Sequence, residues 1–98
     1  MNIYLVHFLV DEDIYYIDQA FKDKQKAIEH IERAYLEFAN ELVEEEMMTS
    51  IDVQNQLEAS RFNAADPNIC VCYGDIQVEY KIPHFGYVQE IDLIWKGW

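Results

Sequence analysis

The chain opens with two apolar segments separated by an acidic turn. Ile3 to Val10 is apolar on both faces of a pleated strand, apart from His7, a pattern typical of a strand covered on both sides. After Asp11 to Asp13, Ile14 to Ile17 is rich in residues that favour strands. The first 21 residues therefore predict an antiparallel hairpin. A buried, hydrogen-bonded His7 is favoured over a catalytic one.

A long helix is predicted next, with Asp23 as its N-cap. Apolar residues then recur with helical periodicity and occupy an arc of about 140° on a helical wheel. They are Ala27, Ile28, Ile31, Ala34, Tyr35, Phe38, Ala39 and Leu42. On the opposite side lie Glu29, Glu37, Glu41 and Glu44. This pattern predicts an amphipathic helix whose apolar arc, Phe38 included, packs in the core of a sheet.

The apolar phase breaks at Glu45 and Glu46, which would point into the arc, so the helix is expected to end or bend there. Thr49 or Ser50 suits the cap of a second helix. Its weaker stripe consists of Val53, Leu57 and Ala64, and Asp66-Pro67-Asn68 ends the helical region.

The last third of the chain predicts three strands. Ile69 to Tyr73 is the first, and Ile76 to Ile82 alternates apolar and polar residues, as a half-buried strand does. Tyr87 to Trp95 is the third. We therefore expect one domain, residues 1–98, of the α+β class. It should contain an antiparallel sheet of about five strands in the order ββα(α)βββ, with one long and one shorter helix packed on one face.

Catalytic and metal-binding motifs are missing from the sequence. Cys70 and Cys72 would point the same way on a strand, about 6.5–7 Å apart, which is unsuited to a disulfide. We interpret them as reduced thiols in a cytoplasmic protein. The histidines lack zinc-binding spacing, and Tyr15 and Tyr16 stand where a calcium-binding loop after Asp11 would need Asp or Asn and then Gly. We expect no cofactor and no bound metal, and we do not expect an enzyme.

The charge is the one functional signal. Acids outnumber bases 19 to 7 in 98 residues, which gives a net charge of −12. Direct binding to nucleic acid is disfavoured because the phosphates would be repelled. The apolar run Ile3 to Val10 is too short to span a bilayer and has no basic residue before it, so neither a membrane span nor a signal peptide is predicted.

The acids are concentrated between Arg33 and Arg61, where 27 residues contain seven acids and no Lys or Arg. Such self-repulsion indicates selection for solubility or for a basic partner. As one helix of about 40 Å, the segment would carry one charge per roughly 6 Å, sparser than the 3.4 Å of one DNA strand. A surface that imitates nucleic acid would therefore need acids from elsewhere. The candidate partner-binding residues are Glu37, Glu41, Glu44, Glu45, Glu46, Asp52, Asp11, Glu12 and Asp13.

Two short terminal segments resemble small uncharacterised ββαβ proteins of phages and mobile elements. They are Ile3-Tyr4-Leu5-Val6-His7 with the later Phe21, Ala27 and Ile28, and Tyr87-Val88-Gln89-Glu90-Ile91-Asp92-Leu93. By size and charge the chain is also similar to the class of phage inhibitors of host defence, of the anti-CRISPR kind, several of which are acidic DNA mimics. No motif transfers residue roles from that class.

These observations favour a small acidic phage-type inhibitor that binds the basic nucleic-acid site of a host protein, such as a defence nuclease, in the bacterial cytoplasm. The alternative is an acidic structural or oligomeric interaction domain, a homodimer included, whose charge serves only solubility. A small enzyme is the third hypothesis. An inhibitor needs acids from separate segments on one face, an interaction domain needs an exposed apolar patch, and an enzyme needs a pocket with perturbed carboxylates.

Overall fold

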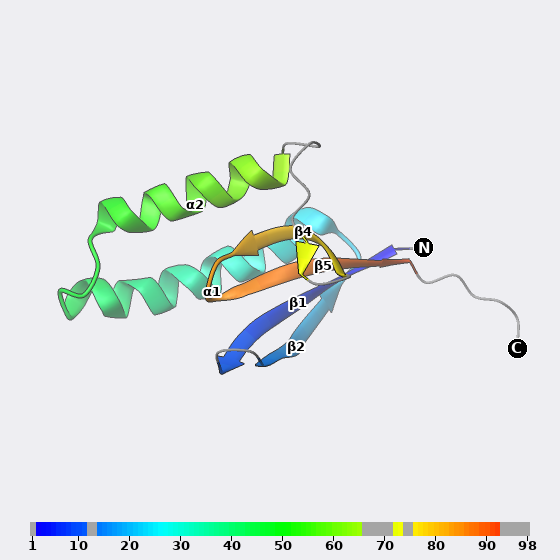
Figure 1. Cartoon of the computed structure of the whole chain (residues 1–98), viewed down its shortest axis with the longest axis horizontal. Coiled ribbons are helices and arrows are strands. Elements are labelled where there is room, and N and C mark those ends of the chain that lie inside the picture. The colour runs from blue at the N-terminus through cyan, green and yellow to red at the C-terminus, as the bar shows by residue number, and fades with distance from the viewer. Residues whose placement is uncertain (1, 12–13, 66–71, 74–75, 93–98) are drawn as a thin grey trace, which may run out of the picture.

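The computed structural model describes residues 2–11, 14–65, 72–73 and 76–92. Its elements are β1 (Asn2–Asp11), β2 (Ile14–Phe21), α1 (Lys24–Glu44), α2 (Ser50–Ala65), β3 (Cys72–Tyr73), β4 (Ile76–Ile82) and β5 (Gly86–Asp92). Figure 1 shows the two helices as an antiparallel pair beside the sheet.

The sheet is antiparallel, and its strand order is β2-β1-β5-β4-β3. Four strands have seven or more residues, whereas β3 consists of two residues that pair with Ile76 and Gln77. The predicted α+β class and antiparallel sheet are confirmed. Of the strand predicted over Ile69 to Tyr73, the structure describes only Cys72 and Tyr73. Residues 69–71 lie outside the described ranges.

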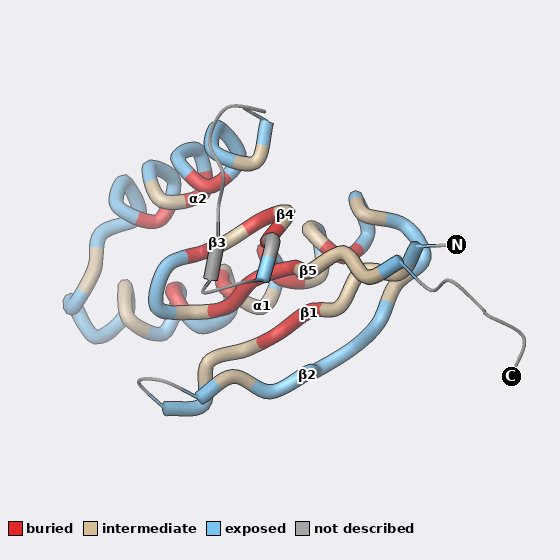
Figure 2. Tube along the Cα trace, turned by 45° about the vertical axis from the view of Figure 1, so that its right-hand side comes forward, coloured by how far each residue is buried: buried red, intermediate tan, exposed pale blue. Residues whose placement is uncertain are grey.

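Both helices cover the same face of the sheet, as predicted. The core joins Val6, Tyr80, Ile82 and Val88 of the sheet to buried residues of the helices, namely Ala27, Ile31, Tyr35 and Ala39 of α1 and Val53 and Leu57 of α2. Figure 2 shows buried segments in β1, β4 and β5, whereas β2 is mostly exposed. Hydrophobic burial between the helical pair and three strands holds the described fold together.

The helix ends follow the local sequence. The Asp23 side chain accepts a hydrogen bond from the Gln25 backbone N–H at 2.8 Å, so Asp23 is the N-cap of α1. The helix ends at Glu44, and Glu46 has a left-handed backbone with φ of 59°. The Thr49 hydroxyl then accepts from the Asp52 N–H while the Asp52 carboxylate accepts from the Thr49 N–H. This reciprocal capping box turns the chain directly into α2.

A β-bulge interrupts the predicted alternation of apolar and polar residues in β4. The register with β5 shifts between Val78, which pairs with Gln89, and Tyr80, which pairs with Val88. Neighbouring residues of β5 point to opposite faces, so Val78 and Tyr80 also do. The prediction that all four apolar residues of β4 share one face is therefore wrong. Tyr80 and Ile82 join the helical core, and Val78 is buried on the other side of the sheet.

His7 lies on that other side and is satisfied, as predicted. Its ring stacks on Tyr87 with centroids 4.4 Å apart, and its Nε2 lies 3.0 Å from the Gln89 side-chain oxygen. Burial, opposed by the weaker effect of the Gln89 hydrogen bond, lowers the pKa of His7. The neutral imidazole is thus the form that the fold accommodates.

The C-terminal half of α1 extends beyond the sheet, as does the start of α2 (Figure 1). Phe38 lies in this overhang and is 48% exposed, although it sits in the middle of the apolar arc. Its ring contacts Phe85 of the β4–β5 turn, with centroids 5.6 Å apart, and the sheet ends there. The prediction of a core Phe38 is therefore wrong, because nothing in the described sheet reaches far enough to cover it.

The contrast between Ile31, which is fully buried, and Phe38 is testable. We expect Ile31→Ala to lower the free energy of unfolding by about 3–4 kcal/mol, the cost of a cavity in a packed core. Phe38→Ala should cost about 1–2 kcal/mol, because half of the ring already contacts water. Urea unfolding at pH 7 measures both values, and equal losses would place Phe38 in the core after all.

Candidate functional site

The six predicted acids of the helical hairpin are all exposed. They come from the last turns of α1, the inter-helix turn and the first turn of α2, and they are Glu37, Glu41, Glu44, Glu45, Glu46 and Asp52. None of the five glutamate carboxylates bonds to a cation within the described part of the chain. We call these six residues the acidic tip.

The acidic tip opposes the helix dipole. The C-terminus of a helix carries partial negative charge and favours cations, and the N-terminus favours anions. The fully described α1 has no basic residue in its last turn and no acidic residue in its first, where Lys24 and Lys26 stand instead. Each misplaced charge costs about 0.3–1 kcal/mol when exposed. The charge arrangement of α1 is therefore unfavourable for the stability of the helix that carries it.

Folding back the chain concentrates these charges. From Glu37 to Glu46 the helix axis rises about 14 Å, and the capping box at Thr49 starts α2 beside it. The five glutamates thus lie within about 14 Å, or one per roughly 3 Å. This density is close to the 3.4 Å spacing of a single DNA strand. The spacing of 6 Å is an average over residues 34–60, and the local density is higher because five of the seven acids lie in residues 37–46.

The acids of the first turn are a separate group. Asp11 is exposed at the end of β1, whereas Glu12 and Asp13 lie outside the described residues. The end of β1, where Asp11 lies, and the α1–α2 turn are both in the left half of Figure 1. They are nevertheless set on different layers, so the described acids form the tip of the hairpin with Asp11 apart from it.

A small aromatic pocket lies between these two groups. It has a volume of about 270 Å³ and is lined by Phe8, Leu9, Tyr16, Ala34 and Phe85. The centroid of the Phe8 ring lies 6.0 Å from the centroid of the Tyr16 ring and 5.4 Å from that of the Phe85 ring. Tyr16 is 47% exposed. This aromatic pocket is open to solvent beside the overhanging part of α1.

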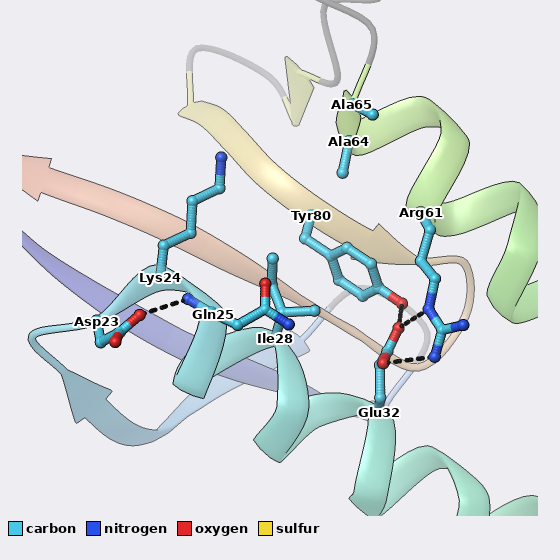
Figure 3. A pocket seen from close by; sticks show the side chains of 9 residues that line it. All are labelled: Asp23, Lys24, Gln25, Ile28, Glu32, Arg61, Ala64, Ala65 and Tyr80. Atoms are coloured by element: carbon cyan, nitrogen blue, oxygen red, sulfur yellow. Dashed lines mark hydrogen bonds and ion pairs between the residues drawn. The ribbon is translucent and has the colours of Figure 1, made fainter.

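A larger cleft, of about 590 Å³, opens between the start of α1, the end of α2 and β4. Figure 3 shows Glu32 pointing toward Tyr80 and Arg61 at one end, with Lys24 at the other. The Arg61 guanidinium donates two hydrogen bonds to the Glu32 carboxylate, at 2.8 and 2.9 Å, and the Tyr80 hydroxyl donates a third at 2.7 Å. Lys24 is paired with Glu79 at 3.0 Å.

The electrostatics of this network are those of a structural ion pair. Burial acts to raise the pKa of Glu32, but the hydrogen bonds from Arg61 and Tyr80 and the Arg61 charge outweigh it, so the pKa is lowered. Burial and the Glu32 carboxylate raise the pKa of Tyr80. A general acid or base at neutral pH needs a pKa near 7, and both shifts go away from that value. The network therefore ties α1, α2 and β4 together without free proton-transfer capacity.

Sequence reasoning missed Glu32, Arg61 and Tyr80 as a unit. Glu32 falls at about 140° on the wheel used above, only 20° beyond the apolar arc, which is the one signal of its burial. Its partners are 29 and 48 residues away, and no local pattern connects them. The aromatic pocket was missed for the same reason, because its lining comes from β1, β2, α1 and the β4–β5 turn.

Within the described ranges, no group of three or more His, Cys, Asp and Glu side chains is placed to hold a metal ion. Cys70 lies outside those ranges, and the Cys72 side chain is not described. No described helix has the length and apolar character that crossing a bilayer requires.

Comparison of the chain with known proteins returned no matching family model, no similar curated protein and no similar solved structure.

The Glu32 network predicts a pH-dependent contribution to stability. The pKa of Glu32 is lower in the folded state than its ordinary value of 4.5, so the folded state favours the carboxylate. That stabilisation is present above pH 4.5 and is lost as the pH falls through the folded pKa. We expect Glu32→Gln to cost about 1–2 kcal/mol at pH 7, because charged hydrogen bonds become neutral ones. The gap between wild type and variant should narrow progressively below pH 4.5.

Urea unfolding of both proteins at pH 7 and at pH 3.5 measures this gap. Glu58→Gln is the control, since Glu58 is exposed on α2 and should change stability by less than about 0.5 kcal/mol. A gap that stayed constant with pH would mean that folding does not lower the pKa of Glu32.

Proposed function

We propose that the protein acts by binding, and that its acidic tip occupies the basic nucleic-acid site of another protein. The observation that carries this proposal is the reversed charge of α1. Carboxylates at the C-terminal end of a helix oppose its dipole and repel one another, so folding does not account for them. A basic partner would account for them, because it compensates both effects in the complex.

The mechanism is substitution of carboxylates for phosphates. A nucleic-acid groove presents Lys and Arg side chains at the spacing of the phosphate backbone. The acidic tip approaches the charge density of one strand, and it is held on two helices whose turn is closed by the capping box. Preorganised charges lose little conformational freedom on binding. Such an inhibitor would exclude nucleic acid by competition and would itself not bind nucleic acid.

In its more specific form, the proposal is of an anti-CRISPR-like inhibitor from a phage, with a defence nuclease of the bacterial host as the partner and the host cytoplasm as the compartment. This form is supported by the small size, the net charge of −12 and the resemblance of the terminal segments to proteins of phages and mobile elements.

One observation favours a second function, that of an interaction or oligomerisation domain. Large apolar side chains are exposed along the edge strand β2 and its neighbour, namely Val10 (62%), Ile14 (58%), Tyr16 (47%) and Ile17 (57%). Exposed edge strands with apolar residues are competent to pair with another chain. A homodimer formed through β2 would leave the acidic tip free. Sedimentation at several protein concentrations detects it directly.

The reversed helix dipole makes the main proposal testable with one variant. Glu41→Lys with Glu44→Lys places two cations at the C-terminal end of α1, where the dipole favours them. We expect this double variant to be more stable than the wild type, by about 1 kcal/mol in urea unfolding. It should also lose binding to the basic partner. A gain in stability together with a loss of binding is the signature of charges kept for recognition.

Binding is measured by capturing bacterial nucleic-acid-binding proteins on the immobilised chain and displacing them with duplex DNA. The control is Glu29→Lys with Asp92→Lys, which makes the same charge change on exposed residues away from the acidic tip. The control should retain DNA-displaceable capture. If the Glu41/Glu44 variant captured the same proteins as the wild type, or if DNA displaced none of them, the acidic tip would not be a nucleic-acid mimic.

A further inference from the structure

The aromatic pocket and the acidic tip share one stripe of α1. Ala34 lines the pocket, and Glu37 and Glu41 follow it at i+3 and i+7, which are neighbouring positions on one helix face. His30, at i−4, confirms where this face points, because its ring contacts Asp18 and Phe21 of β2. Helical side chains lean toward the preceding turn, so Glu37 extends back toward the pocket.

The pocket therefore combines three kinds of group. Phe8, Tyr16 and Phe85 supply aromatic rings, Ala34 supplies an aliphatic side chain, and the carboxylates of Glu37 and Glu41 follow Ala34 on the same face of α1. Neither Glu37 nor Glu41 forms a hydrogen bond or ion pair with any residue that the structure describes. Phe38, at i+4 from Ala34, adds a half-exposed ring beside Phe85.

We propose that this pocket binds the side chain of an arginine presented by the partner protein. The planar guanidinium stacks on aromatic rings, and its forked N–H groups donate to carboxylates. The aliphatic stem of arginine would contact Ala34. A volume of about 270 Å³ is below the range of sites for drug-sized ligands and suits a single side chain. This inference rests on the proposed function, since it names the residue by which a basic partner would be anchored.

Arginine is favoured over lysine because of the geometry of the groups present. Lysine is a compact, strongly hydrated charge that gains little from a flat aromatic wall. The three lining rings are inclined to one another, with interplanar angles of 54° and 68° at Phe8. They form a corner with apolar walls, and the carboxylates are confined to the α1 side. Such a corner stacks one flat cation and orients its N–H groups toward Glu37 and Glu41.

The test uses the whole isotope-labelled protein and N-acetyl-arginine methylamide as the probe. NMR titration should show saturable chemical-shift changes at Leu9, Tyr16, Ala34 and Phe85. N-acetyl-citrulline methylamide, which is uncharged but similar in shape, is the matched control and should give no saturable change. The lysine analogue should bind at least about two-fold more weakly than the arginine probe. Equal or tighter lysine binding would overturn the assignment to arginine.

Variants separate the aromatic and acidic contributions. Tyr16→Leu removes the ring but keeps an apolar side chain, and it should weaken arginine binding about two- to five-fold. Tyr16→Phe should bind as the wild type does. Glu37→Gln with Glu41→Gln should weaken binding at low salt, whereas Glu29→Gln should not. Thermal melts confirm that each variant is folded. Shifts spread over all acidic residues, or unaffected by Tyr16→Leu, would show that the pocket is not the site.

The outcomes distinguish a wrong assignment of the arginine pocket from a wrong proposed function. If the arginine probe binds in the pocket but no captured protein is displaced by DNA, the pocket is an arginine site on a protein that does not mimic nucleic acid. If the capture of proteins that DNA displaces depends on Glu44 while the arginine probe does not bind in the pocket, the acidic tip acts alone. The inference about arginine is then wrong.

Discussion

The buried carboxylate of Glu32 is the interaction on which the arrangement of the helices depends. It lies between three elements that hydrophobic contacts alone would leave free to slide, and it binds one group from α2 and one from β4. An unpaired carboxylate at this depth would be costly, so the native packing must supply Arg61 and Tyr80 together. The directional bonds thereby set the position of α2 relative to α1 and the sheet. The path of the inter-helix turn, and with it the place of the acidic tip, follows from that position.

The two ends of the molecule are built on different principles. Near the start of α1, charges are paired, as in Lys24 with Glu79 and Arg61 with Glu32. At the acidic tip, like charges accumulate on helices that extend past the sheet. The aromatic pocket lies between the region of paired charges and the acidic tip, because the sheet ends near Phe85 while α1 continues. Recognition surfaces of this kind combine an apolar anchor with charges at its rim.

Local patterns carried much of the fold. Asp23 and Thr49 mark helix starts because capping is a contact between near neighbours, and Glu45 marked the end of α1 by breaking the apolar phase. The failures share a different cause. The bulge at Glu79 is defined by how β4 pairs with β5, and the exposure of Phe38 by how far the sheet extends. The partners of Glu32 lie in distant segments. Each depends on contacts between remote parts of the chain, which helical and strand periodicity cannot report.

The overhang of the helical pair has a consequence for how this surface can change over time. Glu41 and Glu44 are exposed on the surface of α1, so replacing either leaves the packing of Ile31 and Val6 undisturbed. Most substitutions at such positions alter stability by less than about 0.5 kcal/mol. The residues of the acidic tip can therefore be substituted one at a time while the protein stays folded. If the acidic tip binds a partner as we propose, its recognition can change without a loss of folding stability.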